Sequence, residues 1–384
     1  MNKRLGRYIT QRVSGESYQA YIPPQLPPNP PINLGALYPY LEKATHALAE
    51  LNSITKSIPN PSLFIYMYVR KEALLSSQIE GTQSSFSDLI LFENHLKTEV
   101  SINDVEEVSN YVKAIHYGLE RLKSNFPLSL RLLQEIHRIL LAGGRGAGKL
   151  PGEFRRSQNW IGGTRPGNAL FVPPSMDHMM SCLSDFENFL HDYSLPILIK
   201  TGIAHVQFET IHPFLDGNGR LGRLLITLLL CENQMIDEPI LYLSLYLKQN
   251  RSMYYELLQQ VRLQGTWETW LEFFLEGIVK SAKQAINTAI EINNLFENDC
   301  KKIESLGRAR FSCLQTLDYL KKLPQTSVPL LSQELGMTLP TARSSLNHMV
   351  DLGVLEEISG KKRDKVYVYK KYLNILEEGA EPFK

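Results

Sequence analysis

The feature that most constrains the fold is the segment from residue 220 to residue 234, RLGRLLITLLLCENQ. Its composition favours a helix, and its leucine and isoleucine residues leave no continuous polar face. Such a helix is stable only when other elements surround it. Its apolar stretch, Leu224 to Cys231, is much shorter than the roughly 20 residues that span a bilayer. The segment therefore predicts a buried central helix in a mainly α-helical fold.

Helical periodicity continues on both sides of this segment. Apolar residues recur at three- and four-residue spacing in the stretches 34–96, 104–141, 175–199, 196–211 and 252–298. Two segments interrupt the pattern. Residues 23–31, PPQLPPNPP, predict an extended arm because proline cannot continue a helix. Residues 149–174 are rich in glycine and proline and predict a loop with a β-hairpin.

The pattern changes again near Leu306. Residues 329–370 predict a helix, a turn, a second helix and two short strands, which is the order of a winged helix-turn-helix. A chain of 384 residues is long enough for two or three cores. We expect an N-terminal helical region at 1–100, which includes the proline arm, a core at 101–290 and a winged helix-turn-helix domain at 300–384. We expect β structure only in the hairpin within residues 149–174 and in the wing.

Composition bounds the partners and the compartment. The 41 basic and 40 acidic residues give a net charge of +1, so no overall field attracts nucleic acid or an anionic membrane. The four cysteines form no CxxC pair and indicate reduced core residues. The basic start of the chain, MNKRLGRYITQRVSG, is followed by no apolar stretch of the kind that a leader peptide has. We therefore expect a cytoplasmic location and no membrane partner.

The segment HPFLDGNGRLGR, residues 212–223, leads into the central helix. Gly217, Asn218 and Gly219 tolerate positive φ, and a helix that begins there offers unpaired N–H groups and partial positive charge. These features predict a site for phosphate oxygens. Arg220 and Arg223 lie three residues apart and can hold further phosphates, so a di- or triphosphate fits better than a lone anion.

Two more residues of this segment offer reactive groups. Asp216 precedes the glycine turn, where its carboxylate can hold a Mg²⁺ ion that also contacts phosphate oxygens. His212 has an intrinsic pKa near ~6.5 and is suited to take a proton from a hydroxyl group. A zinc site made by His205, His212 and Asp216 is an alternative, although the spacing differs from HExxH and no cysteine joins these residues.

The same segment resembles the signature of the Fic (Fic/DOC) family, His-x-Phe-x-Asp/Glu-Gly-Asn-Gly-Arg-x-x-Arg, at every defined position. The resemblance covers residues from about 20 to 285. It implies a protein adenylyltransferase with a helical Fic core, which moves AMP from ATP to a Ser, Thr or Tyr hydroxyl of a target protein with Mg²⁺ as cofactor. Relatives with altered glycines and arginines in the loop transfer other groups, so the intact GNGR favours AMP.

The resemblance also implies roles for single residues. His212 is the catalytic base, Phe214 anchors the loop and Asp216 is the metal ligand. The residues implied for ATP binding are Glu80, Asp216, Gly217, Asn218, Gly219, Arg220, Leu221, Gly222, Arg223, Tyr254 and Tyr255. Arg262 stands where some relatives have asparagine, and this departure concerns the adenine contacts.

Two other segments resemble further features of the family. SSQIEG, residues 76–81, matches the inhibitory signature Ser/Thr-x-x-x-Glu-Gly/Asn, which implies that Glu80 pairs with Arg223 and that Ser76 lies one helical turn away. Residues 155–174 resemble the flap that holds a target by strand addition. Its residues nearest the nucleotide are implied to be Asn159, Trp160, Ile161 and Gly162. An ordinary capped helix and a hairpin that only covers the core remain the alternatives.

The C-terminal part leaves its partner open between DNA and protein. Its second helix, from about Pro340 to Leu352, presents a single arginine, and the wing offers Lys361, Lys362, Arg363 and Lys365. Two alternative functions follow: a DNA-binding regulator whose Fic core senses nucleotide, and removal of AMP with the help of Glu80. The resemblance also implies self-modification and homodimers.

Overall fold

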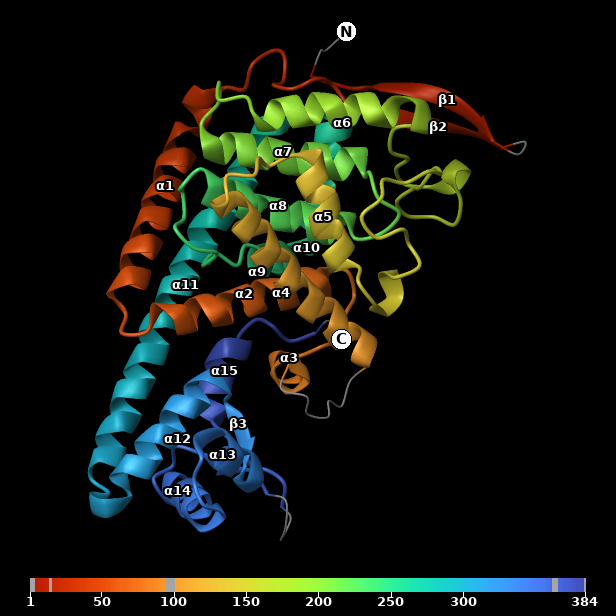
Figure 1. Cartoon of the computed structure of the whole chain (residues 1–384). Helices are drawn as coiled ribbons and strands as arrows, with labels where there is room; N and C mark the ends of the chain where they lie inside the picture. Colours follow the sequence, from red (N-terminus) through yellow and green to blue (C-terminus); the bar gives the residue numbers. More distant parts are fainter. Residues whose placement is uncertain (1–3, 14–15, 94–100, 361–364, 383–384) are drawn as a thin grey trace.

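The central helix is α8 (Asn218–Glu232), and its leucine side chains are buried. In the computed structural model, which describes residues 4–13, 16–93, 101–360 and 365–382, four helices contact it. They are α2 (Pro61–Ile79), α4 (Ile102–Lys123), α5 (Leu130–Leu140) and α7 (Ile197–Ile211). Figure 1 shows α8 near the middle of these helices. The prediction of a buried central helix in a mainly α-helical fold is confirmed.

The remaining helices cover this centre. Those of the core are α3 (Phe86–Glu93), α6 (Met176–Leu190), α9 (Ser244–Gln249) and α10 (Arg251–Gln264). Single 3₁₀ turns lie at η1 (Gly144–Gly146), η2 (Pro166–Asn168) and η3 (Gly307–Ala309). No helix in the described ranges has both the length and the apolar character that a membrane crossing requires.

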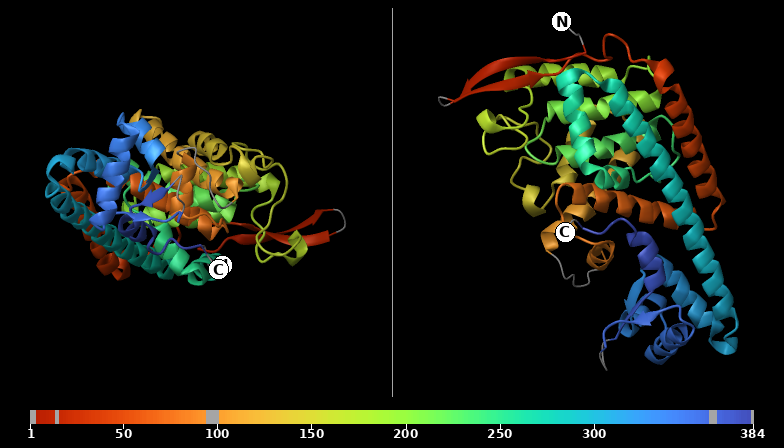
Figure 2. Two further views of the ribbon diagram at one scale, coloured as in Figure 1. Left: turned by 90° about the horizontal axis from the view of Figure 1, so that it is seen from below. Right: turned by 180° about the vertical axis from the view of Figure 1, so that it is seen from behind.

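Two long helices run side by side along one flank of the molecule (Figure 2). They are α1 (Leu34–Ser57) and α11 (Trp267–Glu304). The 38 residues of α11 extend about 57 Å at 1.5 Å per residue, from the core into the C-terminal part. The predicted boundary between residues 290 and 300 therefore falls inside a continuous helix.

The C-terminal part is built from four helices and a small sheet. In chain order these elements are α12 (Arg310–Lys322), β3 (Gln325–Ser327), α13 (Val328–Leu335), α14 (Leu339–Asp351), β4 (Glu356–Glu357), β5 (Val366–Val368) and α15 (Lys370–Glu377). The strands pair antiparallel in the order β3-β5-β4. The two helices and two strands expected from the sequence lie in this order, while the wing residues Lys361, Lys362 and Arg363 fall outside the described residues. The winged-helix assignment stays a prediction.

The longest strands form a hairpin that the sequence analysis did not expect. β1 (Arg7–Val13) pairs with β2 (Glu16–Ile22) along its whole length, and the hairpin extends from the top of the molecule in Figure 1. The expectation that β structure is confined to the flap and the wing was therefore wrong. The signal was present, because two runs rich in tyrosine, isoleucine and threonine flank residues 14–15, which are Ser-Gly.

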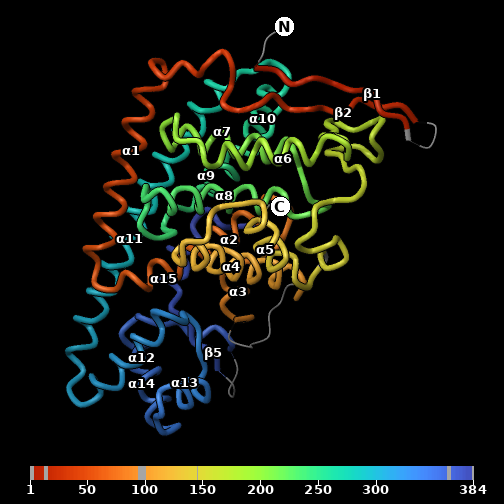
Figure 3. Tube along the Cα trace, turned by 45° about the horizontal axis from the view of Figure 1, so that its top comes forward, coloured from red at the N-terminus to blue at the C-terminus, as the bar shows by residue number. Residues whose placement is uncertain are grey.

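The segment after α15 returns to the core and ends beside α2. The side-chain amide of Gln78 donates to the carbonyl oxygen of Ala380 at 2.8 Å. Lys248 Nζ donates to Gln78 Oε1 at 2.7 Å and also to the carbonyl oxygen of Glu381. The trace in Figure 3 shows the end of the chain next to the core helices, well above the module from which it comes.

Candidate active site

The segment 212–223 consists of a loop at residues 212–217, which joins α7 to α8, and of the first six residues of α8. His212 caps α7 in the left-handed conformation, with φ of +49°, and Gly217 precedes α8 with φ of +76°. Between them, Phe214 is fully buried and stacks on the ring of His137, with 3.8 Å between ring centroids. The loop is therefore anchored to α5 by an aromatic contact, and the helix begins where the sequence predicted.

Hydrogen bonds hold the loop from inside. The side chain of Asn218 accepts from the Phe214 N–H at 2.9 Å and donates to the Phe214 carbonyl at 2.8 Å. The amide is hydrogen-bonded at both ends and Asn218 is buried, so its side chain supports the loop. His137 Nε2 lies 2.9 Å from the Asp216 carbonyl, and its Nδ1 accepts from the Gly152 N–H. Burial lowers the pKa of His137 to about 4, so it donates as a neutral imidazole.

Two residues of the flap fix the backbone at His212. The guanidinium of Arg155, which is fully buried, donates to the His212 carbonyl at 3.1 Å. The amide of Asn159 donates to the carbonyls of His212 and Phe214 at 3.1 and 2.9 Å. Burial lowers the pKa of His212 to about 4, and the charge of Arg262 lowers it further. At neutral pH the imidazole is therefore uncharged and can accept a proton.

Ser76 and Glu80, the two residues for which the resemblance implies an inhibitory role, lie at the end of α2, directly against α8. Arg223 Nη2 contacts Glu80 Oε1 at 2.6 Å, and Arg223 Nε donates to Ser76 Oγ at 2.8 Å. The side chain of Arg223 is 1% exposed and that of Glu80 is 37% exposed. A Cβ atom at Gly219 would lie 2.1 Å from Glu80 Oε1. The carboxylate thus lies against the first turn of α8, where the sequence predicted phosphate binding.

Glu80 is ionised in this arrangement. Burial raises the pKa of its carboxyl group, but the charge of Arg223 and its hydrogen bond lower it more, and Arg220 lowers it further. The pKa therefore ends below its ordinary value. An anion lies at the start of α8, which is the kind of group that a helix N-terminus and two arginines favour.

The other arginine of the segment has a different partner. Arg220 Nη1 lies 3.2 Å from Glu107 Oε2 in α4, and its Nη2 lies 3.7 Å from Asp216 Oδ1. The carboxylate of Asp216 also accepts from the Gly217 N–H at 2.7 Å and is 41% exposed. Within the described part of the chain no three histidine, cysteine or acidic side chains converge as metal ligands. Asp216 therefore fits a Mg²⁺ ion whose other ligands are phosphate oxygens and water.

His205 has a structural role rather than a zinc-binding one. Its Nδ1 lies 3.0 Å from the Gly222 carbonyl in α8, and its Nε2 lies 2.8 Å from the hydroxyl of Tyr254 in α10. Both nitrogens are engaged, so the imidazole ties α7 to its neighbours. Of the two tyrosines expected at the nucleotide, Tyr254 is buried in this network and Tyr255 is exposed. Leu221 is likewise fully buried.

Arg262, the departure noted from the family pattern, supports the loop from α10. It donates to Thr210 Oγ1 at 3.1 Å and to the Glu209 carbonyl at 3.2 Å. Its guanidinium also lies over the ring of Phe171, 4.1 Å from the centroid. The arginine therefore connects the end of α7 with the flap.

The flap is less regular than a hairpin of two strands. Ile161 and Phe171 form a single antiparallel bridge, while Trp160 is exposed and Gly162 has φ of +69°. The Tyr21 N–H donates to the carbonyl of Val172 at 2.9 Å, so strand β2 borders the flap.

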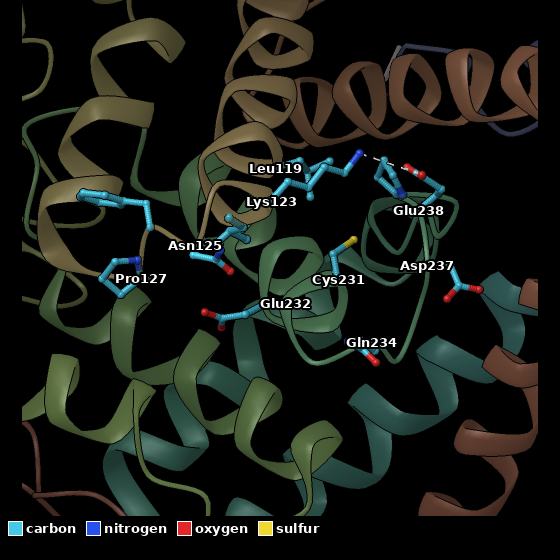
Figure 4. A pocket seen from close by; sticks show the side chains of 12 residues that line it. Leu119, Lys123, Asn125, Pro127, Cys231, Glu232, Gln234, Asp237 and Glu238 are labelled. Atoms are coloured by element: carbon cyan, nitrogen blue, oxygen red, sulfur yellow. Dashed lines mark ion pairs between the residues drawn. The ribbon is translucent and has the colours of Figure 1, made fainter.

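A cavity of about 380 Å³ lies at the opposite end of α8, next to Cys231 and Glu232. Figure 4 shows its lining side chains, with the ion pair between Lys123 and Glu238 at 4.0 Å. The 15 residues of α8 separate this cavity from the loop by about 20 Å. It is therefore not part of the site described above.

Four residues that contact the segment 212–223 were not singled out from the sequence: Glu107, His137, Arg155 and Glu209. Each is a single residue in a segment with an ordinary helical or loop pattern. Their contacts join segments that are 3 to 113 residues apart along the chain. Only Glu209 had a local signal, because it lies three residues before His212.

Comparison with known proteins gives a consistent result. The Fic/DOC family N-terminal model matches residues 38–120, and the Fic/DOC family model matches residues 127–230. A protein named protein adenylyltransferase Fic from Drosophila virilis is 29% identical over 221 residues, which are 56% of this chain and 41% of that protein. Its namesake from Drosophila ananassae is 32% identical over 162 residues, covering 41% of this chain and 30% of that protein. The chain thus matches less than half of the length of these relatives.

Solved structures are similar in fold. A Fic family protein from Desulfovibrio desulfuricans G20 has a TM-score of 0.56 at 20% identity, covering 86% of this chain and 95% of that one. A Fic domain containing signaling protein from Bacteroides thetaiotaomicron has a TM-score of 0.52 at 18% identity, covering 64% of this chain and 97% of that one.

Proposed function

This chain carries the N-terminal and Fic domains of the Fic/DOC family, and from that premise we propose that it transfers AMP from ATP to a hydroxyl group of a protein. The observation that carries the proposal is the position of Glu80. Its carboxylate lies against Gly219 and pairs with Arg223 at the start of α8. A site that holds an intramolecular anion so closely is built for an anionic ligand, and ATP supplies one.

His212 acts as the base in this reaction. Its neutral imidazole takes the proton of the target hydroxyl, the hydroxyl oxygen forms a bond to the α-phosphorus, and the bond between the α-phosphorus and the leaving oxygen breaks. Pyrophosphate leaves with the electron pair of that bond. Arg155 and Asn159 hold the left-handed backbone of His212 by hydrogen bonds to its carbonyl oxygen. This keeps the imidazole at the start of the loop.

Different residues of this segment bind different phosphates of ATP. The backbone of residues 217–219 contacts the α- and β-phosphates. Arg220 contacts the β-phosphate, and Arg223 contacts the γ-phosphate. Asp216 would hold a Mg²⁺ ion, which would supply positive charge to balance the charge on the phosphate oxygens. The exposed carboxylate of Asp216 supports this assignment.

The pair between Glu80 and Arg223 keeps the resting enzyme inhibited. Arg223 is occupied by Glu80 and Ser76, so it cannot bind a γ-phosphate until Glu80 leaves. The partial exposure of Glu80 at the end of α2 supports such a movement, because the carboxylate already meets water on one side.

The experiment compares three purified proteins: the wild type, Glu80→Gly and His212→Ala in the Glu80→Gly background. Each is incubated with Mg²⁺ and ATP labelled at the α-phosphate, and the protein is analysed for label and for intact mass. We expect self-modification to rise in Glu80→Gly and to vanish when His212 is also removed. Label that persists without His212, or Glu80→Gly that binds ATP but transfers no more than the wild type, would contradict the proposal.

A further inference from the structure

Glu209 is a buried carboxyl group with an incomplete set of partners. It lies in the last turn of α7, three residues before His212. Its Oε2 is 3.9 Å from His212 Nδ1, and its Oε1 has no hydrogen-bond partner among the residues that the structure describes. A Cβ atom at Gly222 would lie 2.5 Å from that Oε1, so the carboxyl group is held between the loop and the backbone of α8. Buried polar atoms without partners are uncommon because their desolvation is not compensated.

Among the described residues, the Nδ1 atom of His212, which lies next to Glu209, has no strong hydrogen-bond partner. This atom lies 3.4 Å from the carbonyl oxygen of Glu209, which is long for a hydrogen bond. A base that accepts a proton at Nε2 works best when an acceptor holds its Nδ1–H, since this fixes the tautomer and stabilises the imidazolium. The Glu209 carboxyl group lies beside this nitrogen.

We propose that Glu209 is a positioning residue for His212: its carboxylate accepts the Nδ1–H hydrogen bond and stabilises the imidazolium that forms as the target hydroxyl loses its proton. This inference rests on the proposed AMP transfer. The proton of the hydroxyl moves to Nε2, the Nδ1 proton stays on His212, and Glu209 remains a carboxylate throughout. Such hydrogen bonds are often long in the free enzyme and shorten in the reacting complex.

The charges around Glu209 link this role to the inhibitory helix. Burial raises the pKa of Glu209 to about 7, Arg223 of α8 lowers it, Glu80 raises it and Arg262 of α10 lowers it. The hydroxyl of Tyr254 also faces Glu209. When Glu80 leaves, a like charge is removed, and the carboxylate form of Glu209 becomes more stable. Separation of Glu80 from Arg223 therefore also favours the ionised form of Glu209, which supports His212 as the base.

The test uses the full chain with Glu80→Gly, in which transfer is expected to be measurable. Glu209→Gln keeps the size of the side chain and removes its charge. We expect kcat to fall about 10–100-fold while KM for ATP changes less than about threefold. We also expect kcat of the Glu80→Gly parent to rise with pH as Glu209 ionises, at pH values below about 7 because the charge of Glu80 is absent, and we expect this rise to disappear in Glu209→Gln. Glu209→Asp retains the charge and is expected to retain the pH dependence at a reduced rate.

Glu72→Gln is the matched control. Glu72 is a second buried glutamate whose pKa burial raises to about 7, and its carboxyl group is bound by Ser244. We expect its replacement to affect stability but to leave the pH dependence of kcat unchanged. A pH dependence lost equally in both variants would show a general effect of neutralising buried carboxyl groups and would overturn the proposal.

A second measurement needs no turnover. ¹⁵N NMR of the wild type at pH 8 reports which nitrogen of His212 carries the proton, and we expect the Nδ1–H tautomer in the wild type and more of the Nε2–H tautomer in Glu209→Gln. An unchanged tautomer together with an unchanged kcat would overturn the proposal.

If Glu80→Gly transfers no AMP at all, the proposed function fails, and the NMR result alone decides the role of Glu209. If Glu209→Gln does not fold, Glu209→Asp carries the test, and a kcat equal to that of its Glu80→Gly parent overturns the proposal.

Discussion

Arg220 and Arg223 at the start of α8 each form an ion pair with a glutamate from another part of the chain, but the two pairs differ in their exposure to solvent. Arg220 and Glu107 are both buried, with side chains 4% and 7% exposed, and Glu107 lies within α4. Arg223 is as buried as Arg220, yet its partner Glu80 is 37% exposed and caps the end of α2. Gly81 follows directly with φ of +100°.

The difference separates a fixed pair from one that can open. Breaking the ion pair between Glu107 and Arg220 would leave two separated charges in the protein interior, which costs several kcal/mol. Withdrawing Glu80 exposes its carboxylate to more water and requires a change only at a helix end, where the chain already turns. Ion pairs of the same chemistry therefore serve different purposes according to how far water can reach them.

The largest expected difference is in stability. Glu107→Ala leaves the buried guanidinium of Arg220 with only the more distant and partly exposed carboxylate of Asp216, and it is expected to lower the free energy of unfolding by about 3 kcal/mol. Glu80→Ala is expected to cost only about 1 kcal/mol, because water can replace a partly exposed carboxylate. Urea denaturation of the two variants measures both values. Equal losses would remove the distinction between the pairs.

The next difference is in activity. Glu80→Gly is expected to raise the rate of label transfer from ATP about 10–100-fold, which corresponds to the usual range of coupling between two sites. Glu107→Gln is expected to lower the rate, since Arg220 then loses the partner that orients it toward the phosphates. Initial rates at saturating ATP measure both effects. A gain of rate in the Glu107 variant would mean that both pairs are inhibitory.

Ser76 allows a smaller change to the pair that opens. Ser76→Ala removes the hydroxyl that accepts from Arg223 Nε at 2.8 Å and leaves the bond to the Ser76 carbonyl intact. A hydrogen bond to a charged group contributes about 1 kcal/mol or more, so we expect transfer to rise about fivefold. Ser77→Ala is the matched control, because the hydroxyl of Ser77 has no hydrogen-bond partner in the described part of the chain. Equal rates in both variants would contradict the role of Ser76.

The smallest expected effect is on pH dependence. The pKa of Glu80 is lowered in the folded chain, so its stabilising contribution is present above its unfolded pKa of about 4.3 and is lost as pH falls below that value. The difference in urea midpoint between the wild type and Glu80→Gln should therefore shrink from pH 7 to pH 4 and below. A difference that stays constant would show that the carboxylate gains nothing from Arg223.

Much of this arrangement was predictable because its determinants are local. The buried helix follows from the apolar residues 224–231, and the placement of Ser76 and Glu80 one turn apart follows from their spacing on α2. The loop at residues 212–217 follows from its glycine turn and the loss of helical pattern.

The rest depends on contacts that local patterns do not encode. Glu107 is 113 residues from Arg220, and His137 is 79 residues from Asp216. The spacing of residues in the sequence therefore does not indicate either contact. Asn218 illustrates the same limit, since its place in the motif suggested a ligand contact while its side chain is used to close the loop. The hairpin β1–β2 is different, because its alternating residues carried a signal that was not used.

The return of the C-terminal segment to α2 has a consequence for the time at which this helix is completed. Gln78 and Ala380 are 302 residues apart, and a ribosome adds about 5–20 residues per second. About 15–60 s therefore pass between the synthesis of the amide and the synthesis of the carbonyl that it binds. During that interval the side-chain amide of Gln78 lacks this acceptor and has the nearby Ser84 carbonyl, to which it donates at 2.9 Å. In each newly made chain, the helix that bears Glu80 therefore receives its hydrogen bond with Ala380 only after the C-terminal module has been synthesised.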